Sequence, residues 1–185
     1  MHIQTAARKR LLRKKRQKLH LPFGTQRLLA LFEGLEGGFA IGASIIVGLS
    51  FANLEKRVLI ISAAIGIIVS GFNNAVVKYS SEHYEDELDG HEEKDTFKYY
   101  FMPAAIEFLS YFAISIIALL PLAFIGDLYL GMALCCLLTL AMLFLAGYWR
   151  GFLMHLHPAK DGLEMLLLGA GIIVMGAITG YLLHL

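Results

Sequence analysis

Apolar residues gather into five long runs that are separated by short polar segments. The runs cover residues 28–50, 58–79, 104–125, 128–149 and 162–184. Each run approaches the roughly 20 residues that an α-helix needs to cross the hydrocarbon core of a bilayer. The runs lack the alternation that marks the strands of a membrane β-barrel. The pattern therefore predicts an all-α integral membrane protein with five transmembrane helices, and the composition agrees, because 57% of the 185 residues are hydrophobic.

Basic residues are concentrated before the first run, and this predicts how the helices are oriented. Nine of the 16 Lys and Arg residues lie in residues 1–27, which contain no Asp or Glu. Cytoplasmic flanks of membrane helices carry such an excess. We therefore expect a basic cytoplasmic N-terminal segment, a transmembrane domain over residues 28–185, and a cytoplasmic loop over residues 80–101. A basic run can also bind nucleic acid or act as a transit peptide, but beside a membrane helix contact with anionic lipid is favoured and no nucleic-acid partner is expected.

Two glutamates, Glu33 and Glu36, lie inside the first apolar run. Three residues apart, they share one face of a helix. Ionised carboxylates are costly in hydrocarbon, so they usually face the interior of a bundle and often mark an ion path. Carboxylates bind divalent ions such as Mn²⁺ and Fe²⁺, and they can exchange protons. We expect this pair to bind an ion at the cytoplasmic mouth of a path; the alternative is a solvated position among lipid headgroups.

Other polar side chains could belong to the same path. Asn73 and Asn74 are consecutive in the second run, and Glu107 is early in the third. The asparagines could complete a cation site through their side-chain oxygens, or they could only hydrogen-bond between helices. Glu107 could pair with Lys78 or face the polar path, and Lys78 itself is expected to extend toward the cytoplasmic interface.

Small residues form stripes in the first two runs, at steps of four residues. The stripes consist of Gly34, Gly38 and Gly42, and of Ser62, Gly66 and Ser70. Such stripes let helix backbones approach each other closely in lipid. Because both stripes run beside polar residues, they predict a packed polar seam formed by the first two helices.

The densest charge lies between the second and third runs. Residues 81–95 hold eight of the 15 Asp and Glu residues of the chain, together with two histidines. Such density would concentrate cations, and carboxylate with imidazole suits Fe²⁺, Mn²⁺ or Zn²⁺. A solvated acidic linker is the alternative. The residues predicted to capture metal are Glu82, His83, Glu85, Asp86, Asp89 and Glu92.

Several short motifs, spread over residues 30–185, together resemble the vacuolar iron transporter (VIT) family. The first helix opens on Glu33-Gly34-Leu35, similar to the family's Asp-Gly-Leu, and the second closes on Lys78-Tyr79-Ser80, similar to its Glu-Tyr-small element. The remaining matching positions are Pro103 and Leu120-Pro121 in the third helix, Gly147 and Arg150 in the fourth, and Gly162 through Gly180 in the fifth.

This resemblance implies a homodimer of five-helix subunits with cytosolic N-termini, which exports Fe²⁺ or Mn²⁺ from the cytosol in exchange for protons. It also implies an ion path along the first two helices at the dimer centre, and metal capture by glutamates of the segment 80–101. The chain differs from the family where Glu33 replaces an aspartate, Asn74 lies near the place of a methionine and Lys78 replaces a glutamate.

The sequence thus predicts a divalent-metal transporter, with Fe²⁺ or Mn²⁺ as the transported ion and no permanently bound cofactor. No catalytic motif is evident, so we do not expect an enzyme. The alternative is a non-transporting membrane scaffold or metal-responsive regulator. Compact loops and the lack of an evident cleavable signal favour a bacterial inner membrane over an organelle membrane.

Overall fold

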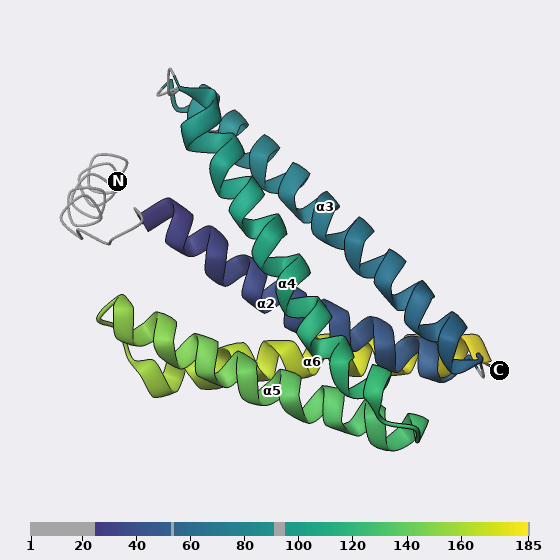
Figure 1. Ribbon diagram of the computed structural model, residues 1–185. Helices are drawn as coiled ribbons and strands as arrows, with labels where there is room; N and C mark the ends of the chain where they lie inside the picture. The colour runs from purple at the N-terminus through teal and green to yellow at the C-terminus, as the bar shows by residue number, and fades with distance from the viewer. Residues whose placement is uncertain (1–24, 53, 91–94, 185) are drawn as a thin grey trace.

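Five long helices form a bundle in the computed structural model, which describes residues 25–52, 54–90 and 95–184 (Figure 1). They are α2 (Thr25–Ser50), α3 (Lys56–Leu88), α4 (Met102–Phe124), α5 (Leu128–Leu153) and α6 (Pro158–His184), and a π-helical turn, η1 (Phe97–Phe101), precedes α4. All five are long and apolar enough to cross a membrane. The prediction of an all-α membrane protein with these helices is therefore confirmed, while most of the predicted basic segment, residues 1–24, lies outside the described residues.

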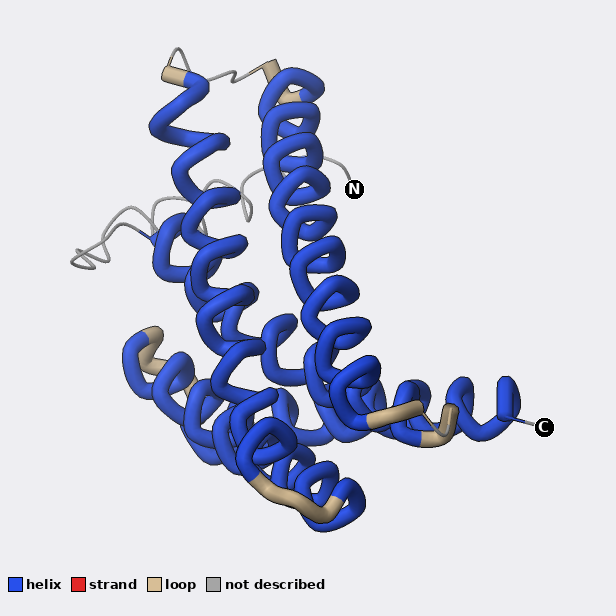
Figure 2. The backbone as a smooth tube through the Cα atoms, turned by 45° about the vertical axis from the view of Figure 1, so that its right-hand side comes forward, coloured by secondary structure: helices blue, strands red, loops and turns tan. Residues whose placement is uncertain are grey.

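Helix α2 is the central element of the bundle. Helices α3 and α4 form one antiparallel hairpin, α5 and α6 form another, and α2 lies between the two (Figures 1 and 2). In the most apolar part of α2, 56% of the residues are buried, against 17% in α3 and 11% in α6. Since α2 contacts all four other helices, polar side chains on its different faces can reach partners on different neighbours.

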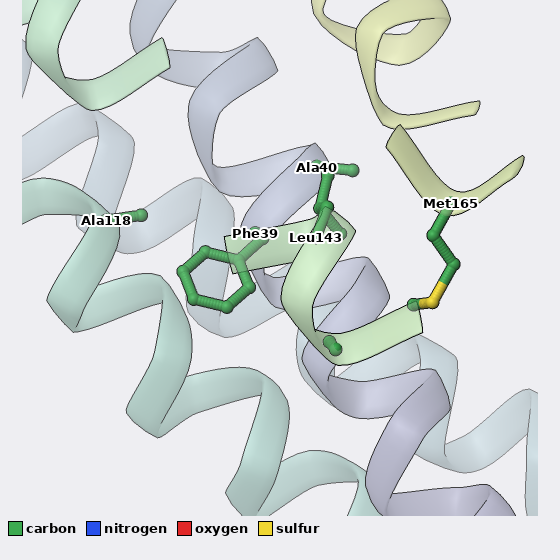
Figure 3. Packing of buried hydrophobic residues seen from close by; sticks show 6 residues of the cluster. Phe39, Ala40, Ala118, Leu143 and Met165 are labelled. Carbon is green, nitrogen blue, oxygen red and sulfur yellow. The ribbon is translucent and has the colours of Figure 1, made fainter. Parts of the chain in front are cut away.

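Apolar side chains from four helices meet in the middle of the bundle. Figure 3 shows Phe39 and Ala40 of α2 beside Ala118 of α4, Leu143 of α5 and Met165 of α6. Each of these side chains is almost completely buried. Lipid is as apolar as this core, so association of the helices depends on close packing rather than on removal of apolar surface from water.

Close packing joins α2 to α4 through the glycine stripe of α2. A Cβ atom added to Gly38 would lie 2.6 Å from the carbonyl oxygen of Tyr111, and one added to Gly34 would collide with Ser110. The hydroxyl of Ser115 donates a hydrogen bond of 2.9 Å to the carbonyl of Gly38. The glycine stripe of α2 therefore lies mainly against α4, whereas Gly66 of the α3 stripe lies against Ile45 of α2. The polar seam predicted for the first two helices thus also involves α4.

Helix α3 continues well beyond the apolar run that predicted it. The run ends at residue 79, but the helix ends at Leu88, where Gly90 follows with a φ of 66°. Residues 80–88 contain neither Gly nor Pro, and a glycine in the left-handed conformation is a common helix terminator. The predicted loop 80–101 is consequently mostly helical, since η1 covers its last five residues, and the end of the α3–α4 hairpin projects past the neighbouring end of α2 (Figure 2).

We expect Gly38→Ala to lower the free energy of unfolding by about 1–3 kcal/mol, because the new methyl group overpacks a contact with backbone atoms. Gly171→Ala is the matched control, because a Cβ atom added to Gly171 of α6 would meet no atom of the described residues within 4 Å. This substitution should change stability by less than about 1 kcal/mol. Thermal unfolding of the purified protein in detergent measures both. Equal unfolding temperatures for the two variants would contradict this account of the α2–α4 contact.

Candidate ion-binding site

The ammonium group of Lys78 lies among three glutamates, at the end of the bundle where α2 and α4 begin and α3 ends. Lys78 pairs with Glu33 of α2, and its Nζ lies 3.2 Å from Oε1 of Glu82 and 3.9 Å from Oε2 of Glu107. The Lys78 side chain is only 10% exposed. The expected extension of Lys78 toward the interface is therefore not observed, because the side chain turns inward to the carboxylates.

Three helices position these four charged groups. Lys78 and Glu82 are one turn apart on α3, Glu33 faces them from α2, and Glu107 faces them from the first turns of α4. Nε2 of Gln26, at the start of α2, donates a hydrogen bond of 3.1 Å to Oε2 of Glu82. The arrangement thus holds three negative charges and one positive charge close together, with an excess of two negative charges when all are ionised.

These side chains line an open pocket of about 380 Å³. Besides the charged groups, the pocket is lined by Asn74, Val77 and Ser81, all from α3. The side chain of Glu33 is 49% exposed and that of Glu82 is 22% exposed, whereas that of Glu107 is 10% exposed. Exposure therefore decreases from Glu33 and Glu82 at the opening to Glu107 on the wall.

Among the three glutamates of the pocket, Glu107 has a buried carboxylate oxygen without a hydrogen-bond donor from the residues that the structure describes. Its Oε2 is buried and accepts no hydrogen bond from the described part of the chain, and its separation from the Lys78 ammonium, 3.9 Å, exceeds hydrogen-bonding distance. Its own carbonyl accepts a hydrogen bond of 2.9 Å from the hydroxyl of Ser110, but the carboxylate does not. A buried carboxylate oxygen with spare acceptor capacity is costly, and a cation or donor that entered the pocket would satisfy it.

Tyr111 fills the space between helices one turn deeper than Glu107 on α4. Its side chain is 1% exposed, and its ring lies against Gly37 of α2 and Gly71 of α3. A Cβ atom at Gly71 would come within 2.6 Å of the ring. Helices α2, α3 and α4 thus meet around this ring, which is packed too closely to leave room for a side chain at Gly71.

The second predicted glutamate of α2, Glu36, has a different cationic neighbour. Nη1 of Arg150, on α5, lies 3.8 Å from Oε2 of Glu36, and both side chains are about one-quarter exposed. The prediction treated Glu33 and Glu36 as one pair. In the structure Glu33 belongs to the Lys78 pocket and Glu36 pairs with α5.

The remaining predicted residues are distributed over α3. Asn74 lines the pocket, but Asn73 is exposed on another face of the helix. His83 packs its ring against Tyr79 and Tyr100, and Asp86 accepts a hydrogen bond of 3.1 Å from the hydroxyl of Tyr100.

The acidic residues predicted to capture metal do not form one cluster. Glu85 and Asp89 are exposed near the end of α3, and Glu92 lies outside the described residues. Within the part of the chain that the structure describes, no three His, Cys, Asp or Glu side chains are arranged to hold a metal ion. The three pocket glutamates surround an ammonium instead.

Sequence reasoning allowed a pair between Glu107 and Lys78, which the structure shows at 3.9 Å. It missed that Lys78 lies among three carboxylates, and it missed the roles of Gln26 and Tyr111. One signal was available: Lys78 and Glu82 have the i, i+4 spacing that places opposite charges side by side on a helix. Nothing in the spacing, however, could show that α2 and α4 each add a carboxylate to the same lysine.

A model of the VIT family matches residues 73–181, more than half of the chain. The matched residues begin at the asparagine pair of α3 and include Lys78, Glu82, Glu107 and the whole of α4 and α5. Helix α2, with Glu33 and Glu36, precedes them. No curated protein matches the chain significantly.

We expect Glu36 and Arg150 to be energetically coupled, because each partly buried charge loses its neighbour when the other is removed. A double-mutant cycle with Glu36→Gln and Arg150→Gln should give a coupling free energy of about 0.5–1 kcal/mol. Thermal unfolding of the two single variants and the double variant measures it. The control cycle combines Glu36→Gln with Arg57→Gln, which changes an exposed arginine near the start of α3. The changes in unfolding free energy should be additive in this control. Additivity in both cycles would show that the Glu36–Arg150 pair contributes nothing to stability.

Proposed function

The chain belongs to the VIT family, and on that premise we propose that it moves Fe²⁺ or Mn²⁺ out of the cytosol in exchange for protons. Membership of this family indicates a multi-pass membrane transporter of metal ions. The observation that supports Fe²⁺ or Mn²⁺ as the transported ion is the pocket of Glu33, Glu82 and Glu107. Three carboxylates at the end of a membrane bundle are hard oxygen ligands for a divalent ion.

In this proposal, metal enters the pocket from the cytosol. The basic residues before α2 favour the cytoplasmic side for this end of the bundle. The exposed acidic residues at the end of α3 would raise the local concentration of cations there. Glu33 and Glu107 then bind the ion, with the side-chain oxygen of Asn74 as a neutral ligand from the same pocket. Protons that replace the metal on the carboxylates provide the exchange.

The ring of Tyr111 bears on how an ion would leave the pocket in this proposal. The ring is buried between Gly37 of α2 and Gly71 of α3, one turn further along α4 than Glu107. We propose that it blocks passage of the ion from the pocket to the other side, as one state of an alternating-access cycle requires. Release on the other side needs the contacts of Tyr111 with Gly37 and Gly71 to open. Helix α4 would therefore have to move relative to α2 and α3.

We also propose that two copies of the chain associate through α3. The exposed face of α3 includes Ile68, Val69, Phe72 and Val76, and it also carries the polar Asn73. Lipid cannot satisfy the hydrogen-bonding groups of an asparagine side chain, so a protein partner on this face is favoured over lipid. A second copy supplies the same asparagine, with which a carboxamide can pair reciprocally.

A metal-responsive regulator without transport is the second candidate function. The observation that favours it is Lys78, whose ammonium already occupies the position among the glutamates that a transported ion would need. In that case metal would bind near the end of α3 and change the conformation of the protein, but no ion would cross the bilayer.

Transport should be tested with the purified protein in liposomes that are acidic inside and contain a fluorescent metal chelator. Addition of Mn²⁺ or Fe²⁺ outside should give uptake that depends on the pH gradient. The double variant Glu33→Gln/Glu107→Gln should lose at least about tenfold in rate, since even the outer-shell partners of metal ligands are worth roughly 10- to 100-fold. The matched control is Glu164→Gln, which changes an exposed glutamate of α6 outside the pocket; this variant should transport metal at the rate of the wild type. Metal binding by the folded protein without uptake would favour the metal-responsive regulator.

The dimer should be tested by cysteine cross-linking in membranes, in a Cys135→Ala/Cys136→Ala background. Oxidation should yield disulfide-linked dimers with a cysteine at Val69 or Phe72, which are 63% and 62% exposed on α3. A cysteine at Leu137, 66% exposed on α5, is the control and should remain monomeric. Cross-linking at Leu137 but at neither α3 position would place the interface elsewhere.

A further inference from the structure

The pocket already contains a cation, the ammonium of Lys78. Three helices surround it with carboxylates from Glu33, Glu82 and Glu107, and all three are within ion-pairing distance of Nζ. A transported metal needs the same carboxylate oxygens. A metal ion and an ammonium that share these ligands would repel each other strongly in a half-buried site.

The pocket is nevertheless not saturated by the lysine. Oε2 of Glu107 accepts no hydrogen bond from the described residues, although its side chain is nine-tenths buried and this oxygen lies 3.9 Å from the ammonium. One positive charge also leaves two negative charges unbalanced, the charge that one divalent ion would neutralise. These two observations indicate that the lysine occupies the site without completing it.

We propose that Lys78 is a tethered competitor of the transported metal, which binds at Glu33 and Glu107 only when it displaces the ammonium. This inference rests on the proposed function. Because the lysine is attached to the site, it competes as an intramolecular ligand at a high effective concentration. Lys78 therefore sets the metal concentration at which the transporter loads, and it excludes cations that bind carboxylates weakly.

The structure provides a place for the displaced ammonium. Glu82 lies one helical turn after Lys78, toward the end of α3, and its side chain is more exposed than that of Glu107. The lysine stem is flexible and its compact charge accepts many geometries. Rotation of the stem can therefore release Glu33 and Glu107 to the metal while the ammonium keeps Glu82 as its partner.

The first experiment follows Lys78 in the unaltered protein. The purified full-length protein in detergent is treated briefly with an amine-acetylating reagent, with and without Mn²⁺, and acetylation of individual lysines is measured by mass spectrometry. Lys78 should react slowly without Mn²⁺ and several-fold faster with it, while the exposed Lys160 of α6 should react equally in both. Unchanged or slower reaction of Lys78 when Mn²⁺ is bound would overturn the inference.

The second experiment measures Mn²⁺ affinity from the free-ion signal in electron paramagnetic resonance. Lys78→Met removes the competitor while retaining a side chain of similar length, and the dissociation constant should fall at least about tenfold, the effect of even a modest change in charge interaction. Lys160→Met is the matched control and should bind like the wild type. An unchanged dissociation constant in folded Lys78→Met would refute the competition.

The acetylation experiment needs no variant, so the inference stays testable if Lys78→Met does not fold. Failure of the inference also differs from failure of the proposed function. Uptake of Mn²⁺ by the wild type, together with a Lys78 that neither moves nor affects affinity, would reject only the competitor. The absence of Mn²⁺ binding and uptake in the wild type and in Lys78→Met would reject the proposed function and this inference with it.

Discussion

The cost of burying charge away from water governs the organisation of this bundle. Glu33, Glu82 and Glu107 repel one another, and a cation between them is what makes their proximity tolerable. Lys78 provides that cation from within the chain, and in doing so it joins α2, α3 and α4 at one end. The other half of the bundle has a weaker equivalent, the contact of Glu36 with Arg150 between α2 and α5.

Close packing of α2 complements this electrostatic contact. Gly34 and Gly38 bring the backbone of α4 so near that the carboxylate of Glu107 reaches the pocket that α2 and α3 form. The same approach confines the ring of Tyr111 between Gly37 and Gly71. A glycine stripe that looks like ordinary membrane packing therefore also places Glu107 in the pocket and Tyr111 against α2 and α3.

The fold was largely predictable, because a helix that crosses the bilayer needs about 20 consecutive apolar residues and such runs are visible in the sequence. The end of α3 was not, since hydropathy falls at residue 79 while the hydrogen-bonded helix continues to Leu88. Of the candidate site, Glu33, Asn74, Glu82 and Glu107 do meet in one pocket. Asn73 does not line this pocket, because neighbouring residues on a helix point about 100° apart. The sequence alone therefore shows that only one of the two asparagines can face the glutamates. Which one does so depends on how α3 is rotated against its neighbours.

The length of α3 has a mechanical consequence. One unbroken helix carries the exposed acidic residues near Leu88, the lysine of the pocket and the apolar face at Val69. From Lys78 to Leu88 the rod rises by about 15 Å, at 1.5 Å for each residue. Because no loop interrupts the helix between Lys78 and Leu88, a rigid-body movement of its outer end would also move Lys78 relative to Glu33 and Glu107. The projecting end of the hairpin and the pocket therefore share one continuous structural element.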